Sequence, residues 1–311
     1  MSTENETSTG MLAAISNELA GAVDLAGKSI VAVRARRHVA AAGIVWASGV
    51  VVTANHVVEQ EEDITLIVPG GKEAKATLAG RDPGTDLAVL RVDDSSLVPA
   101  SIGDSANLRV GQFTLAVARP GGEGLAASSG IISAISGGWR TWKGGMVDAL
   151  IKVDLTLYPG FSGGPLVDAA GRVVGLNTSG LSRGGSLTIP TSTISRVVEA
   201  LLARGKISRG YLGVGLQPVR LPEDLRQTLS LTQAGGLMLV RVEEQGPGAR
   251  GGLLLGDILI TLKEKPVEDT NHVQDQLGPE SVGNAFPARV IRGGALHSLT
   301  LTVGEHQETG R

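Results

Sequence analysis

The sequence predicts a mainly β protein. Glycine occupies 44 of the 311 positions, and aromatic residues make up only 3% of the chain. Such a composition is typical of many short strands joined by tight turns. From Ser29 onward, short runs rich in β-branched residues alternate with glycine, aspartate and proline. This alternation predicts a pair of all-β barrels.

Two segments depart from the β pattern. Residues 1–10 are polar and predict a disordered tail, whereas residues 11–26 have apolar side chains at helical spacing. We expect this first helix to dock onto the β domain. Residues 191–204 predict a second helix that begins with Ser/Thr residues, ends at Gly205 and closes the first domain. The apolar stripes are Leu12, Ile15, Leu19 and Val23 in the first helix, and Ile194, Val197, Val198, Leu201 and Leu202 in the second.

Length and composition exclude several classes of protein. A chain of 311 residues with 42% hydrophobic and 19% charged residues is long enough for two globular domains. A formal net charge of −3 offers no basic stripe, so we expect no nucleic-acid partner. The chain has no cysteine and no His-Glu-x-x-His pattern. Disulfides, thiol catalysis and a metalloprotease site are therefore not expected, and we predict no cofactor and no metal.

The N-terminal residues do not have the pattern of a targeting segment. They begin MSTENET, which is acidic, and the apolar stretch that follows is interrupted by Asn17, Glu18 and Asp24. A secretory signal has a cationic start and an unbroken apolar run, and a membrane span needs a longer one. We therefore expect no membrane span and a cytoplasmic location.

A serine among glycines is the most informative feature of the chain. Residues 160–165 read GFSGGP, with Ser162 at the third position, and an apolar run follows. A serine hydroxyl becomes a nucleophile when a base takes its proton and backbone N–H groups hold the oxyanion that forms. Flanking glycines let the backbone turn sharply and approach a substrate carbonyl closely. Ser162 is therefore a candidate nucleophile.

A candidate base and a candidate acid lie upstream of this serine. Residues 48–58 predict a buried β-branched strand that ends at His56, and histidine has an unperturbed pKa near neutrality that suits a general base. Asp86 immediately precedes another apolar strand. A carboxylate in that setting needs a donor, and an imidazole N–H would serve. Any one of these residues taken alone is as well explained by a surface, core or turn role.

The chain order of the three residues separates two kinds of hydrolase. The order His56, Asp86, Ser162 matches the chymotrypsin-type arrangement, whereas α/β-hydrolases place the acid and the histidine after the serine. The α/β-hydrolase nucleophile also lies between a strand and a helix. Here residues 165–176 predict a strand, a turn and a second strand. An esterase of the α/β-hydrolase fold is therefore disfavoured.

At these residues the sequence resembles the HtrA/Deg family of trypsin-like serine proteases. The matching segments are residues 53–58, 82–90 and 159–166. The resemblance implies a chymotrypsin-like double β-barrel protease domain over residues 26–206 and an α+β PDZ domain over residues 207–305. Residues 1–25 would form an N-terminal tail and helix, and residues 306–311 a C-terminal tail.

The resemblance also assigns roles to residues of the protease domain. His56 would be the general base, Asp86 its orienting acid and Ser162 the nucleophile, and the N–H groups of Gly160 and Ser162 would form the oxyanion hole. The family usually has asparagine before the nucleophile, whereas this chain has Phe161, which could tilt the loop. Leu157 would wall the primary substrate pocket. Because no acidic residue lies between residues 155 and 162, we expect cleavage after small or medium aliphatic residues.

The C-terminal third carries the PDZ part of the resemblance. Residues 210–215 resemble the carboxylate-binding loop of PDZ domains, with Tyr211, Leu212, Gly213 and Val214 as its peptide-binding residues. Residues 246–259 match the most recognisable internal stretch of the family. Exposed N–H groups in such a loop bind the terminal carboxylate of a peptide, and a sheet edge receives its backbone. Residues 271–277 would form the helix that lines the groove, with Val273 and Leu277 one turn apart.

These features predict a serine endopeptidase that cleaves unfolded or misfolded polypeptides in protein quality control. Its PDZ domain would bind C-terminal peptides and could regulate the protease. A peptide-binding chaperone or scaffold with little proteolysis is the alternative. The resemblance implies a homotrimer held by aromatic N-terminal contacts, although the first aromatic residue of this chain is Trp46.

Overall fold

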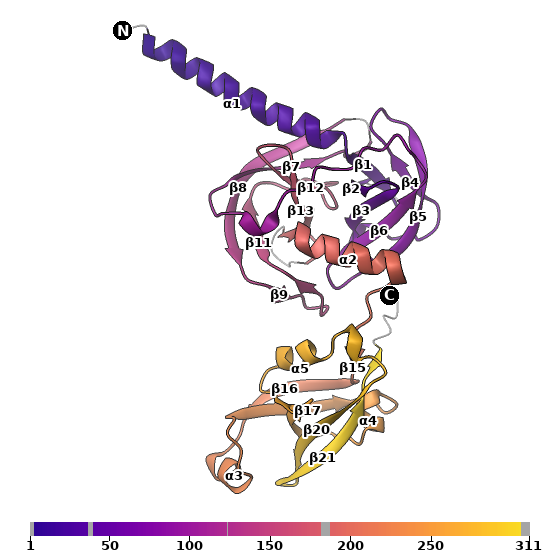
Figure 1. Cartoon of the computed structure of the whole chain (residues 1–311), viewed down its shortest axis with the longest axis vertical. Coiled ribbons are helices and arrows are strands. Elements are labelled where there is room, and N and C mark those ends of the chain that lie inside the picture. The colour runs from indigo at the N-terminus through magenta and orange to yellow at the C-terminus, as the bar shows by residue number, and fades with distance from the viewer. Residues whose placement is uncertain (1–2, 37–39, 123, 182–186, 306–311) are drawn as a thin grey trace. The chain divides into compact units, whose positions relative to one another are not determined.

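The computed structural model describes residues 3–36, 40–122, 124–181 and 187–305 (Figure 1). The chain divides into two compact units, Met1–Ile207 and Ser208–Arg311. The predicted C-terminal tail over residues 306–311 lies outside the described residues. Each unit is built mainly from strands, which confirms the predicted fold class.

The first unit begins with a closed six-stranded barrel. Its strands follow the order β1-β2-β3-β6-β5-β4, and all neighbours pair antiparallel. The side chains of β3 are buried throughout because the strand faces the barrel interior on one side and neighbouring elements on the other. The strands are β1 (Ile30–Arg34), β2 (Ala41–Ala47), β3 (Val50–Ala54), β4 (Ile64–Ile67), β5 (Glu73–Asp82) and β6 (Leu87–Val92).

A second closed barrel follows in the same unit, with the order β11-β14-β13-β12-β7-β8. The predicted strand-turn-strand after Ser162 is confirmed, because β12 and β13 pair antiparallel. The strands are β7 (Phe113–Ala118), β8 (Ala126–Ser136), β11 (Leu150–Asp154), β12 (Pro165–Asp168), β13 (Val173–Thr178) and β14 (Leu187–Pro190), and β9 (Trp139–Arg140) pairs with β10 (Met146–Val147) as a separate hairpin. One apolar core runs through both barrels.

The helix α2 (Thr191–Arg204) connects the two barrels and confirms its prediction. It contacts β5 and β6 of the first barrel and β13 and β14 of the second. Its apolar stripe is buried, and Gly205 ends it in the left-handed conformation at φ 74°. A glycine fits there because it lacks the Cβ that disfavours this conformation.

The N-terminal helix α1 (Thr3–Gly27) differs from the prediction in two ways. It begins eight residues earlier than residue 11, so the expected disordered tail is wrong for residues 3–10. The expected docking holds only for the last turns, which contact β7 and β12 (Figure 1). Leu12 and Ile15 are 70% and 50% exposed, whereas Ala22 and Ala26 are buried.

A buried arginine fixes the end of this helix. The Arg119 guanidinium donates to the backbone oxygens of Gly27 and Ile30, both at 3.2 Å. Burial lowers the pKa of Arg119 from its ordinary value, because it disfavours the charged form. The two carbonyl oxygens compensate part of that cost, so Arg119 joins the helix end to β1 and the second barrel.

The second unit is a twisted antiparallel sheet with short helices. The strand order is β16-β17-β18-β20-β21, with β19 paired to β18, and a separate pair joins β15 and β22. The strands are β15 (Gly210–Tyr211), β16 (Val214–Arg220), β17 (Gly235–Val242), β18 (Ile258–Leu262), β19 (Lys265–Pro266), β20 (Ala285–Arg292), β21 (Ala295–Thr302) and β22 (Gly304–Glu305). The helices are α3 (Glu223–Thr228), α4 (Pro247–Arg250) and α5 (Thr270–Gln276).

A buried ion pair stabilises this sheet. Arg292 donates to both carboxylate oxygens of Asp257, at 2.8 and 2.7 Å. Burial alone would raise the pKa of Asp257, but the hydrogen bonds from Arg292 and from the Leu254 N–H outweigh it and lower that pKa below its ordinary value. The pair therefore stays ionised, with both partners bonded.

Among the described residues, no helix combines the length and apolarity needed to cross a membrane.

Candidate active site

The general-base candidate lies at the end of a buried strand, as the sequence predicts. The strand β3 leads into a single 3₁₀ turn (Asn55–Val57) that contains His56. Asp86 lies on the tight turn between β5 and β6, with φ at 57°. Aspartate is among the few residues that tolerate this left-handed conformation. The Asn55 N–H donates to the Asp86 carbonyl oxygen at 2.9 Å, so the two turns are joined through their backbones.

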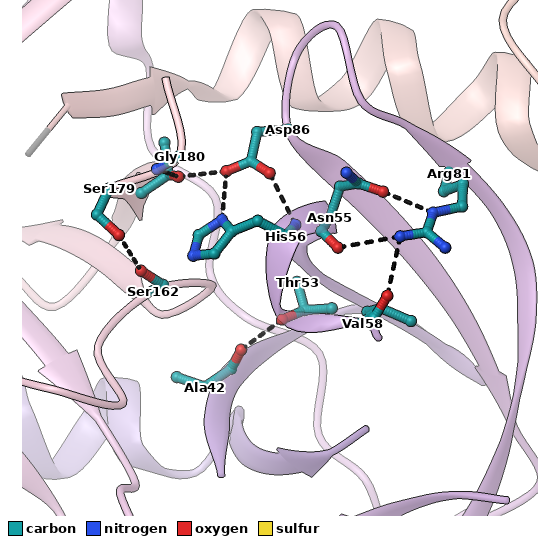
Figure 2. Close-up of polar contacts among 11 residues, drawn as sticks. Ala42, Thr53, Asn55, His56, Val58, Arg81, Asp86, Ser162, Ser179 and Gly180 are labelled. Atoms are coloured by element: carbon teal, nitrogen blue, oxygen red, sulfur yellow. Dashed lines mark hydrogen bonds and ion pairs between the residues drawn. The ribbon is translucent and has the colours of Figure 1, made fainter. Parts of the chain in front are cut away.

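The Asp86 carboxylate holds His56 by two hydrogen bonds (Figure 2). One oxygen, Oδ2, lies 2.7 Å from His56 Nδ1, and the other, Oδ1, accepts from the His56 backbone N–H at 2.8 Å. A carboxylate accepts, so Nδ1 carries the proton and Nε2 is left as the basic nitrogen. Asp86 is 3% exposed. The structure therefore places this histidine and this carboxylate in direct contact.

The second barrel completes the surroundings of this pair. Thr178 Oγ1, at the end of β13, donates a short hydrogen bond to Asp86 Oδ2. Two residues later, a Cβ on Gly180 would lie 2.5 Å from Asp86 Oδ2 and 2.7 Å from His56 Nδ1. Such distances are never seen for a real Cβ, so only glycine fits without a shift. The sequence analysis did not select Thr178 or Gly180. The sequence signal at these positions is a polar run after an apolar strand.

The loop of Ser162 is held through its backbone. The Ala42 N–H donates to the Ser162 carbonyl oxygen at 3.1 Å, and the Gly163 N–H donates to Asn177 at 2.9 Å. Gly160 and Gly163 have φ of 93° and 86°. A Cβ on Gly163 would collide with the Ala42 carbonyl oxygen. Both glycines are required by conformation, and Gly163 also by space.

The Ser162 hydroxyl contacts another serine. Its Oγ lies 3.3 Å from Ser179 Oγ, and within the described part of the chain no hydrogen bond joins it to His56. Figure 2 shows Ser162 on the side of the imidazole away from Asp86, where Nε2 points. Hydrogen bonds of a resting site are often absent until substrate binds. The structure thus brings the three predicted side chains to one place, with the serine turned toward Ser179.

Two backbone N–H groups beside Ser162 are free to bind an oxyanion. In the described part of the chain, neither the Gly160 N–H nor the Ser162 N–H donates to a protein acceptor. The intervening Phe161 N–H donates to the Tyr158 carbonyl oxygen at 3.0 Å. Buried or partly buried N–H groups are normally paired, so two unpaired donors beside the candidate nucleophile could bind a hydrogen-bond acceptor such as an oxyanion.

Phe161 is a buried anchor of the loop. Its side chain is 1% exposed and belongs to the core of the two barrels. The ring of Tyr158 meets it edge-to-face at 5.7 Å. The phenyl ring is therefore buried in the core and fixes residue 161 of the loop. Leu157, the predicted pocket wall, is half-buried and packs on the same core.

The elements predicted to form a peptide groove lie next to each other in the second unit. The helix α5 packs against β16, and the β16 edge toward it has no strand partner among the described residues. Val273 and Leu277 are buried in the core of the unit, together with Leu212. Val214 is partly buried against the same core.

An acidic side chain lies at the predicted carboxylate loop. Gly213 has φ at 69°, and its carbonyl oxygen accepts from the Glu243 N–H at 2.9 Å. Tyr211 donates its hydroxyl to Glu243 Oε2 at 2.7 Å. This hydrogen bond to a carboxylate raises the pKa of Tyr211 above its ordinary value. Glu243 therefore ties the start of the loop to the end of β17.

Comparison with known proteins identifies both units. Residues 41–176 match the trypsin-like peptidase domain, and residues 210–303 match the PDZ domain. A solved structure of the HtrA-type protease AlgW with a decapeptide is 30% identical and has a TM-score of 0.74, and the match covers 93% of this chain and 99% of that one. The chain belongs to the HtrA family. A serine endoprotease from Yersinia pestis is 27% identical, with a TM-score of 0.75, over 94% of this chain and 98% of that one.

Curated members of the HtrA family extend beyond this chain. A probable periplasmic DegP-like serine endoprotease of Halomonas elongata is 35% identical over 87% of this chain and 57% of its own length. The corresponding protein of Pseudomonas savastanoi pv. phaseolicola is also 35% identical, over 86% of this chain and 56% of its own. The chain therefore spans little more than half the length of these relatives.

Proposed function

We propose that this HtrA-family chain is a serine endopeptidase that hydrolyses peptide bonds of unfolded or misfolded polypeptides. The observation that carries the proposal is the His56–Asp86 pair, with Nδ1 at 2.7 Å from the carboxylate and Ser162 on the opposite side of the imidazole. The trypsin-like domain match and the serine endoproteases among its relatives support it.

In the proposed mechanism, the Ser162 hydroxyl turns from Ser179 to His56 Nε2 as substrate binds. His56 takes the proton while Oγ attacks the peptide carbonyl carbon, and it then donates that proton to the leaving amine. Asp86 keeps the reactive tautomer and stabilises the imidazolium. The N–H groups of Gly160 and Ser162 hold the oxyanion of the tetrahedral intermediate. Water then hydrolyses the acyl-enzyme in the same way.

Labelling by a fluorophosphonate probe, followed by casein cleavage, tests this mechanism. Wild-type protein should react covalently at Ser162, and Ser162→Ala should abolish labelling and lower turnover by about 10⁶-fold. Ser129→Ala, which changes an exposed serine of β8, is the matched control and should keep both activities. Equal casein cleavage by Ser162→Ala and wild type would refute the nucleophile. Peptide binding without any labelling would favour the chaperone or scaffold.

The substrate preference is proposed from the pocket wall. Leu157 and the absence of acidic residues from position 155 to 162 favour small or medium aliphatic side chains at the cleaved position. A basic side chain would find no partner there. Peptide libraries should return aliphatic residues, and a strong preference for arginine or lysine would contradict the assignment.

The PDZ domain is proposed to bind C-terminal peptides between β16 and α5, using the loop of Tyr211, Leu212, Gly213 and Val214. Val273 and Leu277 would contact the terminal side chain. The AlgW structures with a decapeptide and a tripeptide agree with a peptide-binding role in the family.

A homotrimer is proposed from family membership, and light scattering of the purified chain tests it. A cytoplasmic location stays a prediction. The two DegP-like relatives differ from it, because both are named as probable periplasmic proteins.

A further inference from the structure

A single arginine binds the turn that carries His56. Arg81, near the end of β5, directs its guanidinium at both flanks of this turn (Figure 2). Its Nε donates to Asn55 Oδ1 at 2.6 Å. Its Nη2 donates to the backbone oxygens of Asn55, at 3.3 Å, and Val58, at 2.9 Å. The residues on either side of the histidine are thus fixed by one planar group.

The turn needs this support because it is short. It consists of three residues, and at its end the Val58 N–H donates to the Asn55 carbonyl oxygen at 3.0 Å. Carbonyl groups at the end of a short helical turn commonly need partners from outside the turn. Arg81 supplies a second donor to the Asn55 oxygen and a donor to the Val58 oxygen. Without these donors, the orientation of the His56 backbone would depend mainly on Asp86.

Arg81 and Asp86 hold the same turn from two sides. Both lie on the β5–β6 hairpin: Arg81 is near the end of β5, where it pairs with Ala88, and Asp86 is on the turn that follows. The side-chain oxygen and the carbonyl oxygen of Asn55 both accept hydrogen bonds from Arg81. The Asn55 N–H donates to the Asp86 carbonyl oxygen. Asn55 is 5% exposed, so these bonds are sheltered from water. The β5–β6 connection therefore clamps the turn around His56.

We propose that Arg81 is a positioning residue for the general base His56, which rests on the function proposed above. It touches neither substrate nor the reacting atoms, and it acts by fixing residues 55 and 58. The three donors point to different acceptors in a plane, which a guanidinium can match and a lysine ammonium cannot. The fourth contact, to Glu61 at 3.0 Å, is exposed and should matter little.

Kinetics on the full chain give the first test. Arg81→Met should lower kcat by about 10- to 100-fold with KM changed less than about threefold, because a displaced base slows the chemical step. Arg81→Lys should recover only a small part of the kcat that is lost in Arg81→Met. Glu61→Gln removes the exposed ion pair, and Arg91→Met removes an exposed arginine of β6; both should keep wild-type kcat.

Chemical rescue separates positioning from a loss of folding. Millimolar guanidinium, far below denaturing concentrations, should raise the kcat of Arg81→Met several-fold, and the same concentration of sodium chloride should not. Thermal unfolding identifies any variant that is not folded. A kcat within threefold of wild type, a loss confined to KM, or a folded variant that guanidinium cannot rescue would overturn the proposal.

An NMR measurement makes the test independent of turnover. The proton on His56 Nδ1, shared with Asp86, should give a low-field resonance in wild type and in Glu61→Gln. In folded Arg81→Met it should broaden or disappear. An unchanged resonance would refute the positioning role even if the chain had no peptidase activity. An unlabelled, inactive wild type with a lost resonance in Arg81→Met would refute the proposed function and leave the positioning role standing.

Discussion

The two halves of the candidate site are held in different ways. On the first barrel, the side chains themselves are fixed: His56 and Asp86 share two hydrogen bonds, and Thr178 bonds the same carboxylate. On the second barrel, the backbone around Ser162 is fixed by Ala42 and Asn177, while the hydroxyl contacts Ser179 Oγ at 3.3 Å. The proposed base is therefore preset, and the proposed nucleophile can rotate.

This difference has a physical consequence for substitutions. A bonded, buried carboxylate that is lost leaves its partners unpaired, which is costly. An exposed hydroxyl contact contributes about 1 kcal/mol or less. Changes on the side of His56 and Asp86 should therefore be severe, and changes to the partner of the Ser162 hydroxyl should be small.

Of the variants that test this difference, Asp86→Asn should have the largest effect on kcat. An asparagine amide can donate to Nδ1 and favour the tautomer that puts the proton on Nε2, which removes the base. We expect kcat to fall by about 10⁴-fold with little change in KM. Peptide hydrolysis measures it, with Asp93→Asn, an exposed carboxylate after β6, as the control. A loss of less than tenfold would show that the pair is not required.

Phe161→Asn tests whether the loop of Ser162 depends on its buried anchor. The change installs the residue usual in the family, yet it removes a ring that is 1% exposed and places an amide in an apolar core. Removing a buried phenylalanine side chain destabilises by about 3–5 kcal/mol. Chemical denaturation should reveal a loss of this size, with Phe113→Asn on the barrel surface as the milder control. An unchanged free energy of unfolding would refute the anchoring role.

Gly180→Ala tests the space behind the fixed pair. The new Cβ would lie 2.5 Å from Asp86 Oδ2, so either the strand end or the carboxylate must move. A displacement of this kind should lower kcat by about 10²-fold. Gly124→Ala meets nothing within 4 Å and should be neutral. If both alanine variants hydrolyse peptide at the wild-type rate, the contact does not constrain catalysis.

The sequence carries more information about the fixed side chains than about their supports. Strand ends and glycines around His56, Asp86 and Ser162 could be recognised locally, because each lies at a boundary between an apolar run and a turn. The role of Thr178 could not, since its partner Asp86 lies 92 residues away and a threonine at the end of a strand has many explanations. The clamp by Arg81 likewise depends on how β5 closes the first barrel.

The N-terminal helix illustrates the opposite error. Polarity over residues 3–10 predicted disorder, because no apolar stripe was available to bury. The structure continues the helix outward from the turns that dock on β7 and β12. A helix already nucleated by packing propagates at low cost. The composition of residues 3–10 alone does not reveal that the helix is nucleated by packing at its other end.

Ser179→Ala should have the smallest effect and the opposite sign. If the Ser179 hydroxyl draws the Ser162 hydroxyl away from His56, removing it favours the reactive orientation, and fluorophosphonate labelling should become about two- to fivefold faster. Ser179→Thr keeps a hydroxyl at this position and should react at close to the wild-type rate. A slower Ser179→Ala would mean that Ser179 orients the nucleophile for attack, and both halves of the site would then be preset.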